Sequence, residues 1–360
     1  MIAYILSKSN LKIKDFFYFN QYLFCDDIEY SDKSKIVAPR MVNVEDDDFV
    51  VCKDDSTNKV IFFGIAYNTN ASDRSTQFSL TLLPKEALFD RFIFASGEST
   101  IATSIEQFIS NTITANWVNS GDSLMDRAYI NPVVQTNTAV AAALSNIVNV
   151  EDGVYNLKTF LGNVKERYGI FLDFVLTNTN PAILTGPVLT INIYHDASDA
   201  VPIDTDVSDI SDTVETYNVD VLAKLNVKWL NTTTNATTYR TFYLKADRSI
   251  TENGSDPNRV DGVVKAAYIE AETQAGMLDE VTNEFQSNRY EHKITFLLRE
   301  GSALYLPDDY YVGRKCQVET KQGVKTSLIT AIERETGSGS RKITLGKLKV
   351  TLTNKLRGKV

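Results

Sequence analysis

The sequence is poor in the residues that build metal sites and disulfide frameworks. Its 360 residues include only three cysteines, Cys25, Cys52 and Cys316, and two histidines, His195 and His292. Three widely spaced cysteines are too few for a disulfide framework or a zinc site, so we expect inert, buried thiols. Two histidines leave little room for a metal centre or a catalytic triad. We therefore predict no catalytic residues, no cofactor and no metal ligands.

Long apolar runs are also missing. No stretch approaches the roughly 18 residues that a membrane-spanning helix needs. The start of the chain has a short apolar run, 2–6, but neither the basic residues nor the cleavage site of a signal peptide. These absences predict a protein without a membrane span, made in the cytosol. At 43% hydrophobic and 10% aromatic residues, the chain can bury a core, which excludes global disorder.

Charge is distributed unevenly. The formal net charge of −9 argues against a protein that binds nucleic acid by neutralising phosphates. From Gly313 to Val360, however, twelve Lys or Arg accompany three Glu, whereas the stretch from Asp196 to Glu215 has seven acids and no basic residue. These stretches are either solvated surfaces of opposite sign or parts of a docking face that meets an acidic neighbour.

Alternating apolar residues predict β-structure at both ends of the chain. Residues 59–67 and 76–83 are typical of the two strands of a hairpin. Gly64 within the first of them indicates a bulge or a tight bend. From residue 292 onward, strand-like segments separated by tight turns predict an antiparallel meander. Further strands are expected at 169–177, 187–195, 217–230 and 237–246.

Helical periodicity marks the middle of the chain. Apolar residues recur at helical spacing over 100–118 and over 156–168. Asn156 is the N-cap candidate of the second helix and Gly169 its stop signal. Candidate caps of the first helix are Ser99, Thr100 and Thr103. Both apolar stripes are interpreted as core faces.

The order of segments predicts a β-rich α+β fold with two small antiparallel β-barrel domains and intervening helix-containing domains. The expected domains are a first β-barrel at 1–95, a helical or mixed domain at 96–170, a mixed β domain at 171–289 and a second β-barrel portion at 290–360 with a basic C-terminal strand. Within the third, we expect an acidic loop at 196–216 and a helical segment at 264–288.

Several of these segments resemble the hub proteins of phage tail baseplates. The runs VAPRMVNVEDDDFVVCKD (37–54), KVIFFGIAYN (59–68) and TQFSLTLLPKEALFDRFIF (76–94) resemble the first domain of tail-associated, or prophage endopeptidase tail, proteins. The run from NRYEHKITFLLRE to the end (288–360), with its turn at Gly313 and its basic tail, is similar to their second barrel. The resemblance covers most of the chain and rests on the succession of segments.

The resemblance implies a homotrimer in which two similar barrels per chain make a pseudo-sixfold ring. Such a ring joins a sixfold tail tube to a threefold tip and gates the DNA channel. The implied partners are the distal tail protein, other baseplate or tail-tube proteins, the tape measure protein, and phage DNA that passes through an acidic lumen without specific binding. The implied location is the virion tail tip. The chain stops at Val360, after the second barrel, and thus resembles the short, non-enzymatic form.

Two other functions remain open from the sequence: a cell-wall peptidase or hydrolase of the tail tip, and a receptor-binding module for host saccharide. A hydrolase would need partners for its histidines. His195 has only Asp196 and Asp199 nearby, while His292 and Glu291 point to opposite faces of a strand. We therefore favour structural histidines.

Acidic clusters and an aromatic run complete the candidates. Glu45–Asp48 is interpreted as a solvated turn, and Phe16–Phe24 as either a core strand or an interface strand in a ring contact. Four further acids depart from the calcium-loop spacing and lack its glycine, so we favour a solvated loop over a weak calcium site. These four are Asp204, Asp206, Asp209 and Asp212.

Overall fold

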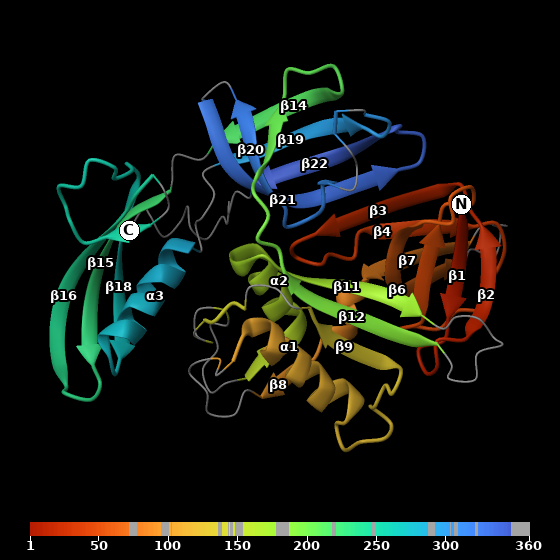
Figure 1. Cartoon of the computed structure of the whole chain (residues 1–360), viewed down its shortest axis with the longest axis horizontal. Helices are drawn as coiled ribbons and strands as arrows, with labels where there is room; N and C mark the ends of the chain where they lie inside the picture. The colour runs from red at the N-terminus through yellow and green to blue at the C-terminus, as the bar shows by residue number, and fades with distance from the viewer. Residues whose placement is uncertain are drawn as a thin grey trace.

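The computed structural model has a β-rich α+β fold, as the sequence predicts (Figure 1). It describes residues 1–71, 78–94, 101, 103–135, 139–142, 144, 147, 154–177, 187–217, 221–246, 249–286, 292–302, 304–305, 309–320 and 323–346. The basic C-terminal tail, 347–360, lies outside the described residues. In the described part of the chain, no helix is both long and apolar enough to cross a membrane.

An antiparallel sheet forms what we call the N-terminal unit, in the order β3-β4-β7-β6-β5-β1-β2. Its strands are β1 (Ile2–Leu6), β2 (Ile13–Tyr18), β3 (Gln21–Asp27), β4 (Ser34–Ala38), β5 (Phe49–Lys53), β6 (Val60–Ala71) and β7 (Phe78–Pro84). Alternate residues of β7 are buried, which is why this segment forms a strand with one face on the core. The hairpin predicted from 59–67 and 76–83 is confirmed as the β6–β7 pair.

Gly64 marks a close backbone approach. A Cβ atom added there would lie 2.5 Å from the Leu83 carbonyl oxygen, a distance that real side chains do not tolerate. The irregularities of β6 fall nearby, in its pairing with β5 at Cys52/Lys53 and in its pairing with β7 at Ala66/Asn68. Gly64 thus allows the backbone of β7 to approach β6 closely, and the bulge itself lies at neighbouring residues.

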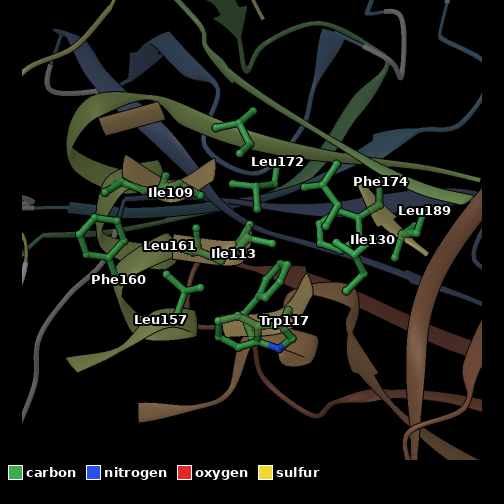
Figure 2. Close-up of a cluster of buried hydrophobic side chains, with 14 of the residues drawn as sticks. Ile109, Ile113, Trp117, Ile130, Leu157, Phe160, Leu161, Leu172, Phe174 and Leu189 are labelled. Carbon is green, nitrogen blue, oxygen red and sulfur yellow. The ribbon is translucent and has the colours of Figure 1, made fainter. Parts of the chain in front are cut away.

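A helical unit follows and packs against the N-terminal sheet. It contains η1 (Lys85–Phe89), β8 (Phe92–Phe94), α1 (Ile105–Ile113), the π-helical turn η2 (Thr114–Val118), β9 (Ile130–Val134), β10 (Val154–Asn156), α2 (Leu157–Tyr168), β11 (Ile170–Thr177) and β12 (Val188–His195). Figure 2 shows its core, where side chains of α1, α2, β9, β11 and β12 meet around Trp117. The two predicted helices are confirmed as α1 with η2 and as α2. The strands predicted at 169–177 and 187–195 are confirmed as β11 and β12.

The helix ends follow from single residues. Asn156 caps α2 by accepting from Thr159 N, and Gly169 ends it at φ 65°, as predicted. The N-cap of α1 is Ser104, which accepts a hydrogen bond from Gln107 N. The cap predictions for α1 were therefore wrong by one or more positions, and Ser99 and Thr100 lie outside the described residues.

The C-terminal unit contains β13 (Val201–Asp204), β14 (Ile210–Tyr217), β19 (His292–Arg299), β20 (Lys315–Thr320), β21 (Gly323–Glu335) and β22 (Ser340–Gly346). The predicted meander is confirmed for β20–β21–β22, but β19, its expected first strand, pairs with β22 and not with β20. The acidic loop predicted at 196–216 is wrong over β13 and β14, because β13 pairs with β20 and β14 pairs with β19. Strand partners from a distant part of the chain override the polar local composition there.

An inserted unit lies between β14 and β19. Its strands β15 (Leu222–Asn231), β16 (Ala236–Leu244), β17 (Ile250–Thr251) and β18 (Val263–Ala271) form a sheet in the order β17-β16-β15-β18, covered by α3 (Gln274–Gln286). The helix predicted over 264–288 is wrong in its first half, which is β18. Parallel pairing with β15 overrides the helix-forming composition of that segment.

Candidate assembly interface

Direct strand pairing joins the N-terminal and C-terminal units. Residues 23–27 of β3 run antiparallel to residues 331–335 of β21, and Asp26 lies opposite Ile332. The ladder continues past β21, because Thr336 N donates to the Tyr22 carbonyl oxygen at 3.1 Å. One sheet therefore runs through both units, with β3 beside β21 (Figure 1). We call this β3–β21 pairing the seam.

The seam is buried by aromatic and aliphatic side chains. Phe24 and Cys25 of β3 and Ile332 of β21 are each less than 8% exposed. The ring of Phe24 stacks on that of Phe62 with 4.5 Å between centroids. Burial raises the pKa of the Cys25 thiol to about 12, so this cysteine stays protonated and unreactive. The seam is thus a packed junction as well as a hydrogen-bonded one.

Five strands of each unit share one topology. β3, β4, β5, β6 and β7 correspond in chain order to β14, β19, β20, β21 and β22, and both sets have the sheet order first, second, fifth, fourth, third. Every neighbouring pair in both sets is antiparallel. β6 and β21 are both long, and each has a register shift against the next strand, at Ala66/Asn68 and Ile329/Ala331.

The register makes this correspondence specific to single residues. When the two register shifts are superposed, the buried positions of one set fall on those of the other. The equivalent pairs, each residue at most 1% exposed, are Val50 and Cys316, Cys52 and Val318, Ile36 and Phe296, Leu80 and Ile343, and Leu82 and Leu345. The chain therefore contains the same five-strand plan twice, although we see no internal repeat in its sequence.

This correspondence identifies a second pair of edges like those of the seam. Because β14 corresponds to β3 and β6 to β21, the counterpart of the seam is a pairing of β14 with the second half of β6. Among the described strands, β14 pairs only with β19, and β6 pairs only with β5 and β7. Both edges are thus open among the described strands of the single chain. An open strand edge is a template for another chain.

The exposure of β14 differs from that of its buried counterpart. Val214 is 59% exposed and Thr216 is also exposed, although β14 is an eight-residue strand. In β3, the residues equivalent to Glu215 and Thr216 are the buried Phe24 and Cys25. A strand with one exposed face and one open edge is a candidate assembly surface.

The aromatic run Phe16–Phe24 is divided between two strands. Phe17, Phe19 and Phe24 are buried in the N-terminal core, whereas Phe16 and Tyr18 of the edge strand β2 are more than half exposed. Half of the run thus packs into the core. Its interpretation as an interface strand remains a prediction for the exposed half.

The two histidines occupy different elements. His292 begins β19, is 1% exposed, and its Nε2 lies 2.8 Å from Ser327 Oγ. His195 ends β12, and its neighbour Asp196 accepts from Arg314 at 3.1 Å and from the hydroxyl of Tyr311. The contacts of Asp196 join the helical unit to the C-terminal unit, whereas His292 and Ser327 both lie within the C-terminal unit.

Acidic residues serve structural roles in the described part of the chain. Asp48 is fully buried and accepts from Lys14 Nζ at 2.7 Å, and this hydrogen bond raises the pKa of Lys14. The solvated turn predicted for Glu45–Asp48 is therefore wrong for Asp48. Asp209 accepts from Ser302 Oγ at 2.7 Å. Within the described ranges, no three His, Cys, Asp or Glu side chains gather as metal ligands would.

All three cysteines are buried thiols, as the sequence predicts. Burial raises the pKa of Cys316 to about 12 and raises that of Cys52 further. A thiolate is therefore negligible at neutral pH at all three positions.

Comparisons with known proteins match the fold and not the sequence. No protein-family model matches this chain, and no curated protein matches it. A tail protein from Neisseria meningitidis MC58 superposes with a TM-score of 0.53 at 10% identity, over 96% of each chain. The 43 kDa tail protein of prophage MuSo2 from Shewanella oneidensis has the same TM-score at 11% identity, over 96% of this chain and 98% of that one.

A third solved structure agrees. The prophage tail protein gp18 from Listeria monocytogenes EGD-e superposes with a TM-score of 0.53 at 10% identity, over 99% of this chain and 97% of its own. These matches span nearly the whole of both chains. The chain therefore has the fold of phage tail and baseplate proteins.

Proposed function

We propose that this chain is a structural virion protein: a homotrimeric hub that joins a sixfold tail tube to a threefold tip and gates the DNA channel. The observation that carries the proposal is the five-strand plan that occurs twice in one chain, already joined by the seam. Each unit curves into a small β-barrel in the assembled ring. Three chains then present six equivalent units, which is the match that a sixfold tube requires.

The ring closes through the second pair of edges. The second half of β6 in one copy pairs with β14 of the next copy, in the geometry of the seam. If the seam register is transferred, residues 69, 70 and 71 lie opposite Tyr217, Thr216 and Glu215 of the neighbouring chain. Such a contact is head-to-tail, so it produces either a closed ring or an open filament. We infer closure at three copies from the resemblance to baseplate hubs.

The remaining parts serve the same role. The ring is built from the domains at 1–95 and 290–360, with β13 and β14 added by their strand pairing. The helical and inserted units project from it towards the tip and close the channel until host binding. The distal tail protein, other tail-tube or baseplate proteins and the tape measure protein are the neighbours, and the protein is located in the virion.

DNA passes through the lumen without binding. The chain carries a net charge of −9, and a lumen lined by acids repels phosphate groups instead of retaining them. We infer a structural role without enzymatic activity, which the likeness to phage tail and baseplate proteins supports. A gel-shift assay at 0.15 M salt with double-stranded DNA is expected to show no complex, and a tight complex would contradict a non-binding lumen.

The ring is tested by a designed cross-link. Cysteines placed by Asn70→Cys and Thr216→Cys become directly opposed across the inter-chain contact, and opposed residues in antiparallel strands fall within disulfide range. Oxidation should give a ladder on a non-reducing gel that ends at three times the chain mass of 40.2 kDa. The native cysteines are buried and should not contribute.

The matched control moves one cysteine along β14. Ser211→Cys with Asn70→Cys displaces the pair by several residues, about 15 Å along a strand, so no cross-link should form. Equal cross-linking of both pairs, a ladder beyond three, or no species above the monomer at any concentration would contradict the proposed ring.

A further inference from the structure

Among the described residues, a helix covers one face of the sheet of the inserted unit. α3 packs on that face through Met277, Val281 and Phe285, on the side towards the rest of the molecule (Figure 1). The opposite face, which we call the outer face, is formed by the alternate residues of β15, β16 and β18. Tyr239 is 75% exposed there, and Tyr268 is 55% exposed. Large exposed aromatics on a sheet face need a physical explanation.

Two rows of tyrosine and lysine cross the outer face. In the first row, Tyr239 of β16 lies opposite Lys228 of β15, which lies opposite Tyr268 of β18. The Lys228 ammonium is 5.5 Å from the centre of the Tyr268 ring, within cation–π range. The second row, four residues along each strand, contains Tyr243, Lys224 and Val264. Four residues of strand separate the rows by about 13 Å.

Smaller residues lie between these rows. Thr241, Asn226 and Ala266 form the intermediate row of the same face. Thr241 Oγ1 donates to Asn226 Oδ1 at 3.1 Å, which directs the amide of Asn226 so that its Nδ2 can donate to a ligand. Large side chains therefore flank small ones across the outer face.

The outer face is cationic. Lys224 and Lys228 lie on it, and the guanidinium of Arg259 stacks over the Tyr243 ring at 4.0 Å. Glu270 is the acid on the same face, and it is engaged by the hydroxyl of Tyr268. A ligand of this face would therefore have flat apolar surfaces for the tyrosines, hydroxyls for Asn226, and negative charge for the lysines.

We propose that the outer face binds an anionic glycan. Sugar rings present C–H faces that pack on tyrosine, hydroxyls that accept from the amide, and sparse carboxylate or phosphate groups that match three cations. Single-stranded nucleic acid also uses stacking platforms, but it carries one charge per nucleotide and depends on a strongly basic groove. Three cations beside Glu270 in a chain of net charge −9 favour the less densely charged polymer.

The test uses the full-length chain on an array of bacterial surface glycans that carry carboxylate or phosphate, printed beside their neutral counterparts and a single-stranded dT12 oligonucleotide. We expect retention by acidic glycans, at least tenfold weaker retention by the neutral ones, and none by dT12. Retention by acidic glycans should also weaken severalfold between 0.05 and 0.5 M salt.

Two variants and two controls make the result specific. Tyr268→Ser and Lys228→Glu should each weaken retention about tenfold or more, since stacking on one aromatic is worth that factor. Tyr18→Ser, at a tyrosine 57% exposed on β2, and Lys293→Glu, at an exposed lysine of β19, should leave retention unchanged. No glycan retention, retention of dT12 alone, or equal losses in variants and controls would overturn the proposal.

Discussion

β5 and β20 occupy the same place in two equivalent units, yet they differ in what their outer faces contact. Val50 and Cys316 are equivalent and fully buried in their respective cores. On the other face, Phe49 of β5 is buried against the helical unit, whereas its equivalent Lys315 of β20 is exposed. The core-facing residues are therefore set by the strand plan, and the outward-facing ones by what covers the sheet.

The seam and its counterpart differ in the same way. β3 buries Phe24 and Cys25 because β21 lies beside it, whereas β14 leaves the equivalent Glu215 half-buried and Thr216 exposed in the single chain. The two units share one topology, yet the edge strand β3 is paired with β21, whereas the corresponding edge of β14 has no partner among the described strands. The difference marks the edge at which we propose the contact between copies, and the following substitutions test it.

The largest effect is expected at the outer face of β5. Phe49→Ala removes a fully buried ring and should destabilise the protein by about 3–5 kcal/mol, whereas Lys315→Ala at the equivalent position should change stability by at most about 0.5 kcal/mol. Urea unfolding, monitored by fluorescence, measures both. Similar losses in the two variants would mean that the outer faces of the two units are equally covered.

The next comparison concerns the strand edges. Cys25→Lys places a charge in the seam and should cost about 3 kcal/mol or more, because a buried unpaired charge is costly. Thr216→Lys should leave the unfolding midpoint of the dilute monomer unchanged but prevent self-association. Thermal unfolding and sedimentation velocity distinguish the two effects. Normal assembly of the Thr216→Lys variant would exclude β14 from the contact between copies.

A third comparison concerns two equivalent buried positions, one charged and one apolar. Arg341 of β22 corresponds to Phe78 of β7, and both are 6% exposed. Arg341 makes a bidentate ion pair with Glu300 at 2.7 and 2.9 Å. Glu300→Ala should cost about 1–3 kcal/mol by leaving the guanidinium without this partner, whereas Arg341→Phe should be close to neutral. Chemical denaturation that ranks them in the opposite order would reject the equivalence at this position.

The smallest effects are expected in the acid range. In the N-terminal unit, paired hydrogen bonds from Arg40 lower the pKa of Asp15. At the C-terminal unit, burial opposes ionisation of Asp196, but hydrogen bonds from Ser198, Tyr311 and Arg314 outweigh it and lower its pKa to about 2.

A carboxylate with a lowered folded-state pKa adds stability above its unfolded pKa, near 3.8, and loses that contribution as the pH falls through the folded value. Asp196→Asn should therefore reduce stability at pH 6 and flatten the decrease between pH 4 and 2. Melting curves across this range provide the measurement. An unchanged acid slope in both Asp15→Asn and Asp196→Asn would show that neither carboxylate contributes.

Local patterns predicted much of this fold because they depend on neighbours in sequence. The cap at Asn156, the stop at Gly169 and the β6–β7 hairpin all follow from residues a few positions apart. The errors fall where distant pairing decides the structure. The acidic strand β14 needs β19, and β18 needs β15, and neither partner can be read from local composition.

The candidate interface was predictable only in outline. The sequence indicated two similar β-rich units. Equivalent core positions hold different residues, such as Val50 and Cys316, so the amino-acid sequence shows no repeat. The seam joins residues about three hundred positions apart, and only coordinates reveal it. The prediction for Asp48 was wrong because a run of acids indicates a solvated turn. The buried carboxylate of Asp48 is instead paired with Lys14 of β2, a partner that the local sequence does not indicate.

Single-particle imaging of the assembled protein is the decisive test of the proposed ring. We expect a threefold particle with six equivalent units around a pore, in which β14 of each copy continues the sheet of β6 in the next. A particle in which β14 remains unpaired, or pairs with β14 of a second copy in a twofold dimer, would contradict it.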